Sequence, residues 1–178
     1  MNKKIVIPGW MNYLKINNLG DNFEILKGKV NIDENAECIV GHSLGALITL
    51  RDFKHSWEKI ILINPPLPKR SIIVWFFKWI NYVVQEGLSV ENQKFSVNPV
   101  VYFRELINCI RLLRIDFAPI IDNLPSDKVI VIRGENDYFF CDDKAVNFLR
   151  SKNIRIIEIA NCGHNWCGKI EDAINKLT

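Results

Sequence analysis

The sequence predicts an α/β fold: a mostly parallel sheet of about five to six strands with helices on both faces. Three observations lead to this prediction. Strand-length runs such as residues 59–63 and 128–132 are apolar after their first lysine, which is typical of strands buried on both faces. Helix-length segments separate these runs. A serine flanked by glycines, Ser43, lies between a strand-like run and a helix-like run.

Turn-forming residues set the ends of the expected elements. The expected strands occupy residues 4–7, 23–26, 37–40, 59–63, 128–132 and 154–159. The expected helices occupy residues 44–53, 72–84, 99–114, 142–151 and 169–177, with a helix or loop at residues 11–19. Proline and glycine interrupt regular structure, so Pro8-Gly9 and Asn64-Pro65-Pro66 end two of the strands. Asp142 is a typical residue for the start of a helix, where negative charge is favoured.

The length of 178 residues fits a single domain at residues 1–178. Residues 67–127 interrupt the alternation, because they contain two expected helices, the first apolar nearly all round, and no convincing core strand. A helix that is apolar nearly all round needs cover on two sides, or an apolar ligand on one. We therefore expect residues 67–127, called the lid segment below, to form an inserted helical lid. The side chains expected to line its pocket are Trp75, Phe76, Trp79 and Phe103, with plain core packing as the alternative.

Composition and charge argue against several classes of function. The formal net charge is only +3, and basic residues do not alternate with aromatic ones, so we expect no nucleic-acid partner. The first apolar stretch is too short for a signal peptide, and the run at residues 71–84 is too short and too polar to cross a bilayer. We expect a cytoplasmic protein with no membrane association.

The cysteines suggest neither a disulfide framework nor a metal site. Their number is five, and their spacing follows no framework pattern, which suits a reducing compartment. Cys162, His164 and Cys167 are metal-ligating residue types, but a structural zinc site needs a second pair of ligands and none is evident. We expect no metal and no organic cofactor.

Residues 41–45, Gly-His-Ser-Leu-Gly, form a G-x-S-x-G pattern. A strand-like run enters this pattern and a helix-like run leaves it, which is the context of a nucleophile elbow. A serine held in so sharp a turn has strained backbone geometry, and glycines two residues away leave room for the turn. Ser43 is the candidate nucleophile. The alternative is a glycine-rich turn with an idle serine.

A serine hydroxyl needs a base to become a nucleophile, and that base needs an acid to orient it. Asp137 and His164 each follow an expected strand, in the chain order Ser, Asp, His. We therefore expect His164 to be the base and Asp137 the acid. The competing carboxylates are Asp142 and Asp143, which better fit the start of a helix, and the more distant Asp116 and Asp122.

Two backbone N–H groups are expected to stabilise the oxyanion that forms during acyl transfer. One belongs to Leu44, the residue after the nucleophile, and the other to Trp10, in the loop after the first strand. The Trp10 ring either packs at the floor of the pocket or lines it.

The motifs Pro8-Gly9-Trp10, Gly41 to Gly45, Gly134-x-x-Asp137 and Gly163-His164 resemble the α/β-hydrolase superfamily over nearly the whole chain. This resemblance implies a serine hydrolase acting on ester bonds. Two departures are present. The chain is shorter than the usual member and lacks the first antiparallel strands, and Pro8-Gly9 replaces the customary His-Gly before the oxyanion loop.

A narrower resemblance is to the compact carboxylesterases of biotin synthesis (the BioH/BioG/BioV group). It is based on Gly9-Trp10, on residues 63–68 (Ile-Asn-Pro-Pro-Leu-Pro) and on the aromatic lid. This resemblance implies hydrolysis of pimeloyl-acyl-carrier-protein methyl ester, with acyl-carrier protein as partner. Residues 69–114 hold seven basic and three acidic residues, an excess that would steer an acidic carrier. The candidate docking residues are Lys69, Arg70, Lys78, Arg104, Arg111 and Arg114.

Three alternatives to this interpretation remain open. The basic residues of the lid segment are also compatible with an ordinary solvated helix face. The protein is then a general short-chain esterase or thioesterase without a carrier partner. A non-catalytic binding module on a hydrolase fold is the third possibility, since a fold does not by itself imply a function.

Overall fold

The computed structural model describes residues 3–9, 19, 23–26, 32, 36–86 and 99–178, with only the backbone for residues 99–102. The described strands are β1 (Lys3–Ile7), β2 (Phe23–Ile25), β3 (Ala36–His42), β4 (Lys59–Ile63), β5 (Val129–Gly134) and β6 (Arg155–Ile159). The described helices are α1 (Leu44–Arg51), α2 (Ile72–Gln85), α3 (Pro99–Arg114), α4 (Ala118–Asp122), α5 (Asp143–Ser151) and α6 (Gly168–Leu177). The helix or loop expected at residues 11–19 lies almost wholly outside the described residues.

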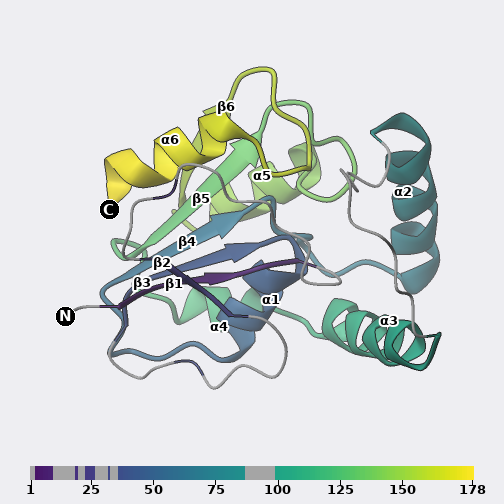
Figure 1. The fold of residues 1–178 in the computed structure, drawn as a ribbon, viewed down its shortest axis with the longest axis horizontal. Helices are drawn as coiled ribbons and strands as arrows, with labels where there is room; N and C mark the ends of the chain where they lie inside the picture. The colour runs from purple at the N-terminus through teal and green to yellow at the C-terminus, as the bar shows by residue number, and fades with distance from the viewer. Residues whose placement is uncertain (1–2, 10–18, 20–22, 27–31, 33–35, 87–98) are drawn as a thin grey trace.

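The strands form one sheet in the order β2-β1-β3-β4-β5-β6, and every described pair of neighbours is parallel (Figure 1). The chain therefore first moves outward from β1 to β2 and then returns to the other side of β1 with β3. Open α/β sheets place their sites beyond the carboxyl ends of the strands at such a reversal. The predicted α/β fold with a mostly parallel sheet is confirmed.

Both faces of the sheet are buried, which explains why its strands are apolar along their length. Alternate residues of β4 point to opposite sides. Ile60 and Leu62 belong to a core with side chains from α1, α4 and α5, including Leu47, Ile121 and Leu149. Ile61 and Ile63 belong to a second core, closed by Ile170 and Ile174 of α6. Helices thus cover both faces, with α6 on one and α1, α4 and α5 on the other.

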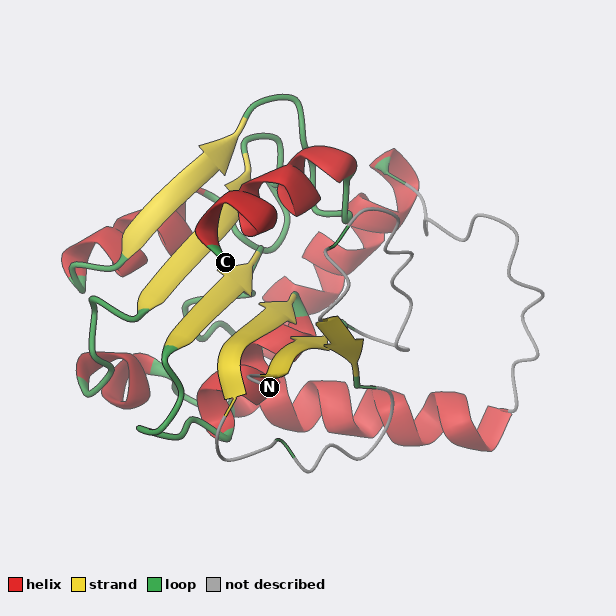
Figure 2. Ribbon diagram, turned by 60° about the vertical axis from the view of Figure 1, so that its left-hand side comes forward, coloured by secondary structure: helices red, strands yellow, loops and turns green. Residues whose placement is uncertain are grey.

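The lid segment divides into two parts with different surroundings. Its last part packs into the main core, where Leu112 at the end of α3, Phe117, Ile121 of α4 and Leu124 are all buried. Its first part lies beyond the carboxyl ends of the strands, where α2 and α3 stand beside the sheet (Figures 1 and 2). The sequence did not predict α4, a short helix with proline in its first turn. The action of residues 67–127 as a lid stays a prediction.

One side of α2 is buried and the opposite side is exposed. Trp75 and Tyr82 are its buried residues, whereas Ile73, Phe77 and Val84, about half a helical turn away, are 68%, 60% and 77% exposed. Core packing, the alternative to a pocket lining, therefore describes one side of this helix only. Among the described residues, no helix combines the length and apolarity needed to cross a bilayer.

Candidate active site

Ser43 occupies the sharp turn between β3 and α1. Its backbone has φ 52° and ψ −119°, a conformation that is rare for a residue with a side chain. The Ser43 N–H donates to the carbonyl oxygen of Ile63 at 2.8 Å, which fastens the turn to β4. A Cβ atom at Gly41 would lie 2.5 Å from Thr49 Oγ1, and one at Gly45 would lie 2.1 Å from the carbonyl oxygen of Ile7. Both glycines of the motif are therefore required by close approach of other atoms.

His164 lies between Ser43 and Asp137 and makes a hydrogen bond to each of them. Its Nε2 atom is 2.9 Å from Ser43 Oγ, and its Nδ1 atom is 2.7 Å from Asp137 Oδ2. An ionised carboxylate only accepts hydrogen bonds, so Nδ1–H donates to Asp137 and Nε2 accepts from the serine hydroxyl. The structure thus joins three residues that are far apart in the sequence into one hydrogen-bonded chain, with Asp137 and His164 almost fully buried.

The loop after β5, residues 135–142, is called the acid loop here because it presents Asp137. The Asp137 carboxylate accepts hydrogen bonds from the backbone N–H groups of Phe139, Phe140 and Cys141. Burial acts to raise the pKa of Asp137, but His164 and the backbone donors act against it. The net result is a pKa below the ordinary value, which keeps this buried group ionised.

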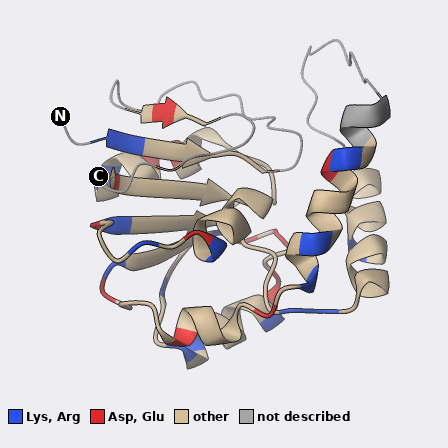
Figure 3. Ribbon diagram, turned by 90° about the horizontal axis from the view of Figure 1, so that it is seen from below, with Lys and Arg blue, Asp and Glu red and all other residues tan. Residues whose placement is uncertain are grey.

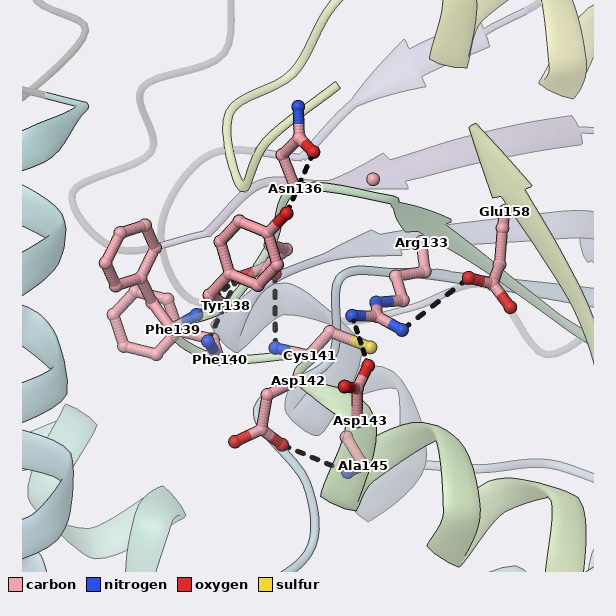
Figure 4. Close-up of polar contacts among 12 residues, drawn as sticks. Arg133, Asn136, Tyr138, Phe139, Phe140, Cys141, Asp142, Asp143, Ala145 and Glu158 are labelled. Carbon is pink, nitrogen blue, oxygen red and sulfur yellow. Dashed lines mark hydrogen bonds and ion pairs between the residues drawn. The ribbon is translucent and has the colours of Figure 1, made fainter. Parts of the chain in front are cut away.

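The competing carboxylates have other partners. Asp142 accepts from the N–H of Ala145 at the start of α5 (Figure 4) and also binds Arg70 and Lys78. Asp143 pairs with Arg133, a buried residue of β5. Asp116 accepts from the backbone N–H of Ala118, and Asp122 pairs with Lys152. Asp137 is therefore the carboxylate that the structure places against His164.

The loop after β6, residues 160–167, is called the histidine loop, and Asn64 holds it in place. Asn64 follows β4 with a positive φ of 45° and is fully buried. Its amide group donates to the carbonyl oxygens of Gly163 and His164 and accepts from the N–H of Gly134. One side chain thus joins the carboxyl ends of β4 and β5 to the histidine loop. Sequence reasoning missed this role, although asparagine directly after a strand tolerates a positive φ.

His42, inside the motif, also supports the histidine loop. Burial and the neighbouring His164 lower the pKa of His42 to about 4, so its ring is neutral at pH 7. Its Nε2–H group donates to the carbonyl oxygen of His164 at 3.0 Å. This oxygen therefore accepts hydrogen bonds from both Asn64 and His42.

The aromatic residues expected to line a pocket have different surroundings. Trp75 is buried and stacks against Phe140 of the acid loop. Trp79 is partly buried and stacks against Phe76, which is itself 54% exposed. Phe103 of α3 is 64% exposed. Phe140 lies directly beside the catalytic candidate His164, with 4.4 Å between their ring centroids, and sequence reasoning had not singled it out.

The candidate docking residues fall into two groups. Arg70 and Lys78 both bind the carboxylate of Asp142, which fastens α2 to the acid loop. The side chains of the second group are exposed: Arg104, Arg111 and Arg114 on α3, whose basic positions Figure 3 shows in blue, and Lys69 in the loop before α2. Only the second group presents its positive charge mainly to solvent.

The oxyanion site is described in part. Leu44 begins α1 directly after Ser43, where the free N–H groups of the helix lie. The loop after β1 also reaches the nucleophile, because a Cβ atom at Gly9 would lie 3.1 Å from Ser43 Cβ. Trp10, the expected second donor, lies outside the described residues.

A disulfide bond between Cys162 and Cys167 encloses His164 in the histidine loop. The cysteine spacing had not predicted this pair, whereas Cys38, Cys109 and Cys141 are free. The bond uses two of the three residues considered as metal ligands. Within the part of the chain that the structure describes, no cluster of His, Cys, Asp and Glu is arranged to hold a metal ion.

No protein-family model matches the sequence, and no curated protein matches it. Solved structures are similar at low identity. The chain resembles MGS-MChE2, an α/β-hydrolase enzyme from a lagoon-sediment metagenome, with TM-score 0.60 and 15% identity over 99% of this chain and 89% of that one. It also resembles a carboxylesterase structure from the Thaumarchaeon Nitrososphaera gargenis, with TM-score 0.57 and 13% identity over 99% of this chain and 89% of that one.

The thioesterase domain of the curacin biosynthetic pathway is a third similar structure, with TM-score 0.55 and 11% identity over 99% of this chain and 90% of that one. Identities this low establish the fold alone. Together with the parallel sheet and the strand–turn–helix around Ser43, they show that this chain has the α/β-hydrolase fold.

Proposed function

We propose that this protein is a serine hydrolase that cleaves carboxylic esters. The observation that carries the proposal is the hydrogen-bonded chain from Ser43 Oγ through His164 to Asp137. This arrangement provides a nucleophile, a general base and an orienting acid in the order that acyl transfer requires. Its location at the carboxyl ends of the strands is where the α/β-hydrolase fold places catalytic residues.

In the proposed mechanism, Ser43 Oγ attacks the ester carbonyl carbon while His164 Nε2 takes the hydroxyl proton. Asp137 holds the tautomer with the proton on Nδ1 and stabilises the imidazolium that forms. His164 then gives its proton to the departing alcohol, which leaves an acyl group on Ser43. Water, activated by His164, attacks this acyl-enzyme and releases the acid.

The negative charge on the carbonyl oxygen needs donors that are already in position. The Leu44 N–H, at the start of α1, is the first donor, and the Trp10 N–H is the proposed second. Each such donor typically lowers the barrier by about 2.7–4 kcal/mol.

As the specific substrate we propose an acyl methyl ester carried on acyl-carrier protein, with pimeloyl-acyl-carrier-protein methyl ester as the first candidate. Two features of the lid segment support this choice. Its apolar and aromatic side chains, of which Tyr82 meets the His164 ring, offer contacts for an acyl chain. The exposed Lys69, Arg104, Arg111 and Arg114 offer positive charge to an acidic carrier. Arg70 and Lys78 are less suited to docking, because Asp142 already binds them.

A second candidate is hydrolysis of short esters or thioesters without a carrier protein. The exposure of Phe76 and Phe103 favours it, because side chains that are 54% and 64% exposed do not enclose a long acyl chain. A non-catalytic binding role is disfavoured, because binding alone gives no reason for a strained serine aligned with a histidine and a carboxylate.

The test compares turnover of pimeloyl-acyl-carrier-protein methyl ester with that of p-nitrophenyl acetate, using Ser43→Ala as the blank. Strong preference for the carrier-bound ester supports the biotin-pathway substrate. Equal or better turnover of the small ester supports the second candidate. Activity retained in Ser43→Ala would contradict the assignment of the nucleophile. If the wild type turns over neither ester, the result would support the non-catalytic binding module instead.

A further inference from the structure

The last turn of α2 is in direct contact with the backbone of the histidine loop. Glu86 caps the carboxyl end of this helix, and its two carboxylate oxygens lie 3.2 Å and 3.1 Å from the backbone nitrogen of His164. The His164 N–H thus donates to a charged acceptor, and such hydrogen bonds are stronger than those between neutral groups. The mechanism above uses the ring of His164 and leaves this contact without a role.

The neighbouring residues make the contact close and directional. A Cβ atom at Gly163 would lie 2.4 Å from Glu86 Oε1 and 2.8 Å from Glu86 Cδ, so the carboxylate occupies the space beside this glycine. One helical turn earlier, the Tyr82 hydroxyl donates to Asn165 Oδ1, and the Tyr82 ring meets the His164 ring edge-on at 5.4 Å. Glu86 and Tyr82 together hold residues 163–165 from the side of α2.

Glu86 is also placed against local electrostatic preference. The carboxyl end of a helix carries partial negative charge, where an acidic residue is unfavourable, and α2 has no basic residue in its last turn. Glu86 further disfavours ionisation of its neighbour, because burial and this carboxylate raise the pKa of Tyr82 to about 12. The helix end is electrostatically unfavourable for Glu86, and its hydrogen bond to the histidine loop is the contact that accounts for a carboxylate at this position.

We infer that Glu86 is a positioning residue for the proposed reaction: its carboxylate fixes the backbone of His164 and so sets where the imidazole lies between Ser43 and Asp137. The His164 main chain is then held from two directions. Asn64 and His42 donate to its carbonyl oxygen from the sheet, and Glu86 accepts from its N–H on the side of α2. This inference rests on the proposed function. It assigns to the carboxyl end of α2 a role in positioning His164.

The test compares Glu86→Ala and Glu86→Gln with Glu135→Gln as the matched control, since Glu135 is an exposed carboxylate in the nearby acid loop. With p-nitrophenyl acetate we expect Glu86→Ala to lower kcat by about tenfold to a hundredfold with little change in KM, because small displacements of catalytic groups have effects of this size. Glu86→Gln should recover most of kcat, because its amide oxygen still accepts from the His164 N–H. The control should match the wild type.

Thermal unfolding separates positioning from a structural role. If Glu86 positions His164, Glu86→Gln should keep the wild-type melting temperature, because its amide oxygen still accepts from the His164 N–H. Glu86→Ala should lower kcat more strongly than it lowers the melting temperature. A fall of more than about 3 °C in both variants, which corresponds to roughly 1 kcal/mol for a chain of this size, would overturn the inference. A kcat for Glu86→Ala within twofold of wild type would also overturn it, as would a change confined to KM.

A spectroscopic measurement keeps the inference independent of turnover. The proton between His164 Nδ1 and Asp137 should give a low-field proton NMR resonance, which we expect to shift or broaden in Glu86→Ala and to persist in Glu86→Gln. An unchanged resonance in Glu86→Ala would overturn the role of Glu86 even if the enzyme is active. If the wild type hydrolyses no ester, the proposed function fails. The resonance then still shows whether Glu86 sets the position of the His164 ring against Asp137.

Discussion

The side-chain amide of Asn64 donates to the carbonyl oxygen of His164 at 2.9 Å, although one hundred positions separate the two residues in the chain. The same side chain accepts from Gly134 N–H at 2.8 Å. Asn64 therefore fixes the loop that carries the candidate base relative to the strand that leads to the candidate acid. The distance between His164 and Asp137 therefore depends on Asn64, a residue outside the two loops that carry them.

Asn64→Ala should reduce both stability and turnover. It leaves the Gly134 N–H and the Gly163 carbonyl without the Asn64 side chain, and each such buried group typically costs about 1–3 kcal/mol. The His164 carbonyl oxygen loses one of its two donors and keeps His42. Chemical denaturation and kcat for p-nitrophenyl acetate measure the two effects. Asn153→Ala is the matched control, because Asn153 also has a positive φ, 57°, but is exposed. Equal losses in the two variants would mean that backbone strain, and not the bridge, explains the result.

Asp137→Asn should lower kcat/KM by about 10⁴-fold, since an amide no longer fixes the imidazole tautomer that accepts the serine proton. Steady-state kinetics with a small ester checks this, and Asp143→Asn serves as the control because Asp143 pairs with Arg133 instead. A loss that is larger in Asp143→Asn than in Asp137→Asn would show that the acid has been assigned to the wrong residue.

Asp142 should make stability depend on pH in the acid range. Burial acts to raise its pKa, but hydrogen bonds from Arg70, Lys78 and the Ala145 N–H lower it to about 2, below the ordinary value of 3.8. Because the folded pKa is the lower one, the stabilisation is present above the unfolded value and is lost as the pH falls towards 2. Asparagine can still cap α5, so Asp142→Asn removes mainly the charge.

The wild type should therefore be more stable than Asp142→Asn at pH 6, and this difference should shrink between about pH 5 and pH 2. Melting temperatures measured across this range provide the check. A difference in stability that stays constant with pH would mean that the charge of Asp142 contributes nothing beyond its capping of α5.

Charge reversal at Arg111 and Arg114 tests the proposed carrier protein. If the carrier docks on the exposed basic residues of α3, the double variant Arg111→Glu/Arg114→Glu should lose kcat/KM for the carrier-bound ester. Turnover of p-nitrophenyl acetate should not change. Reversal of two exposed basic residues distant from the lid segment in the sequence, Arg155 and Lys176, is the control. Equal losses for both double variants would argue against a specific docking surface.

The sequence predicted every described strand and every described helix except α4, because apolar runs and turn residues are local signals. The ends of some elements differ from the prediction. β3 extends through Gly41 and His42 into the motif, since the ladder with β4 continues to His42 and Ile63. The helix α4 was missed because five residues with a proline give no period to recognise.

The sequence by itself determined the candidate nucleophile, base and acid. The amino-acid sequence shows their residue types, their chain order and their places after strands. The contacts that hold these residues were decided by the tertiary structure. Asn64, His42 and Glu86 meet at the His164 backbone from β4, β3 and α2, and hydrogen bonds across such separations leave no periodic signal in the chain. The tertiary structure also decided which basic residues of the lid segment are paired. Asp142 binds Arg70 and Lys78 only after folding has brought them together.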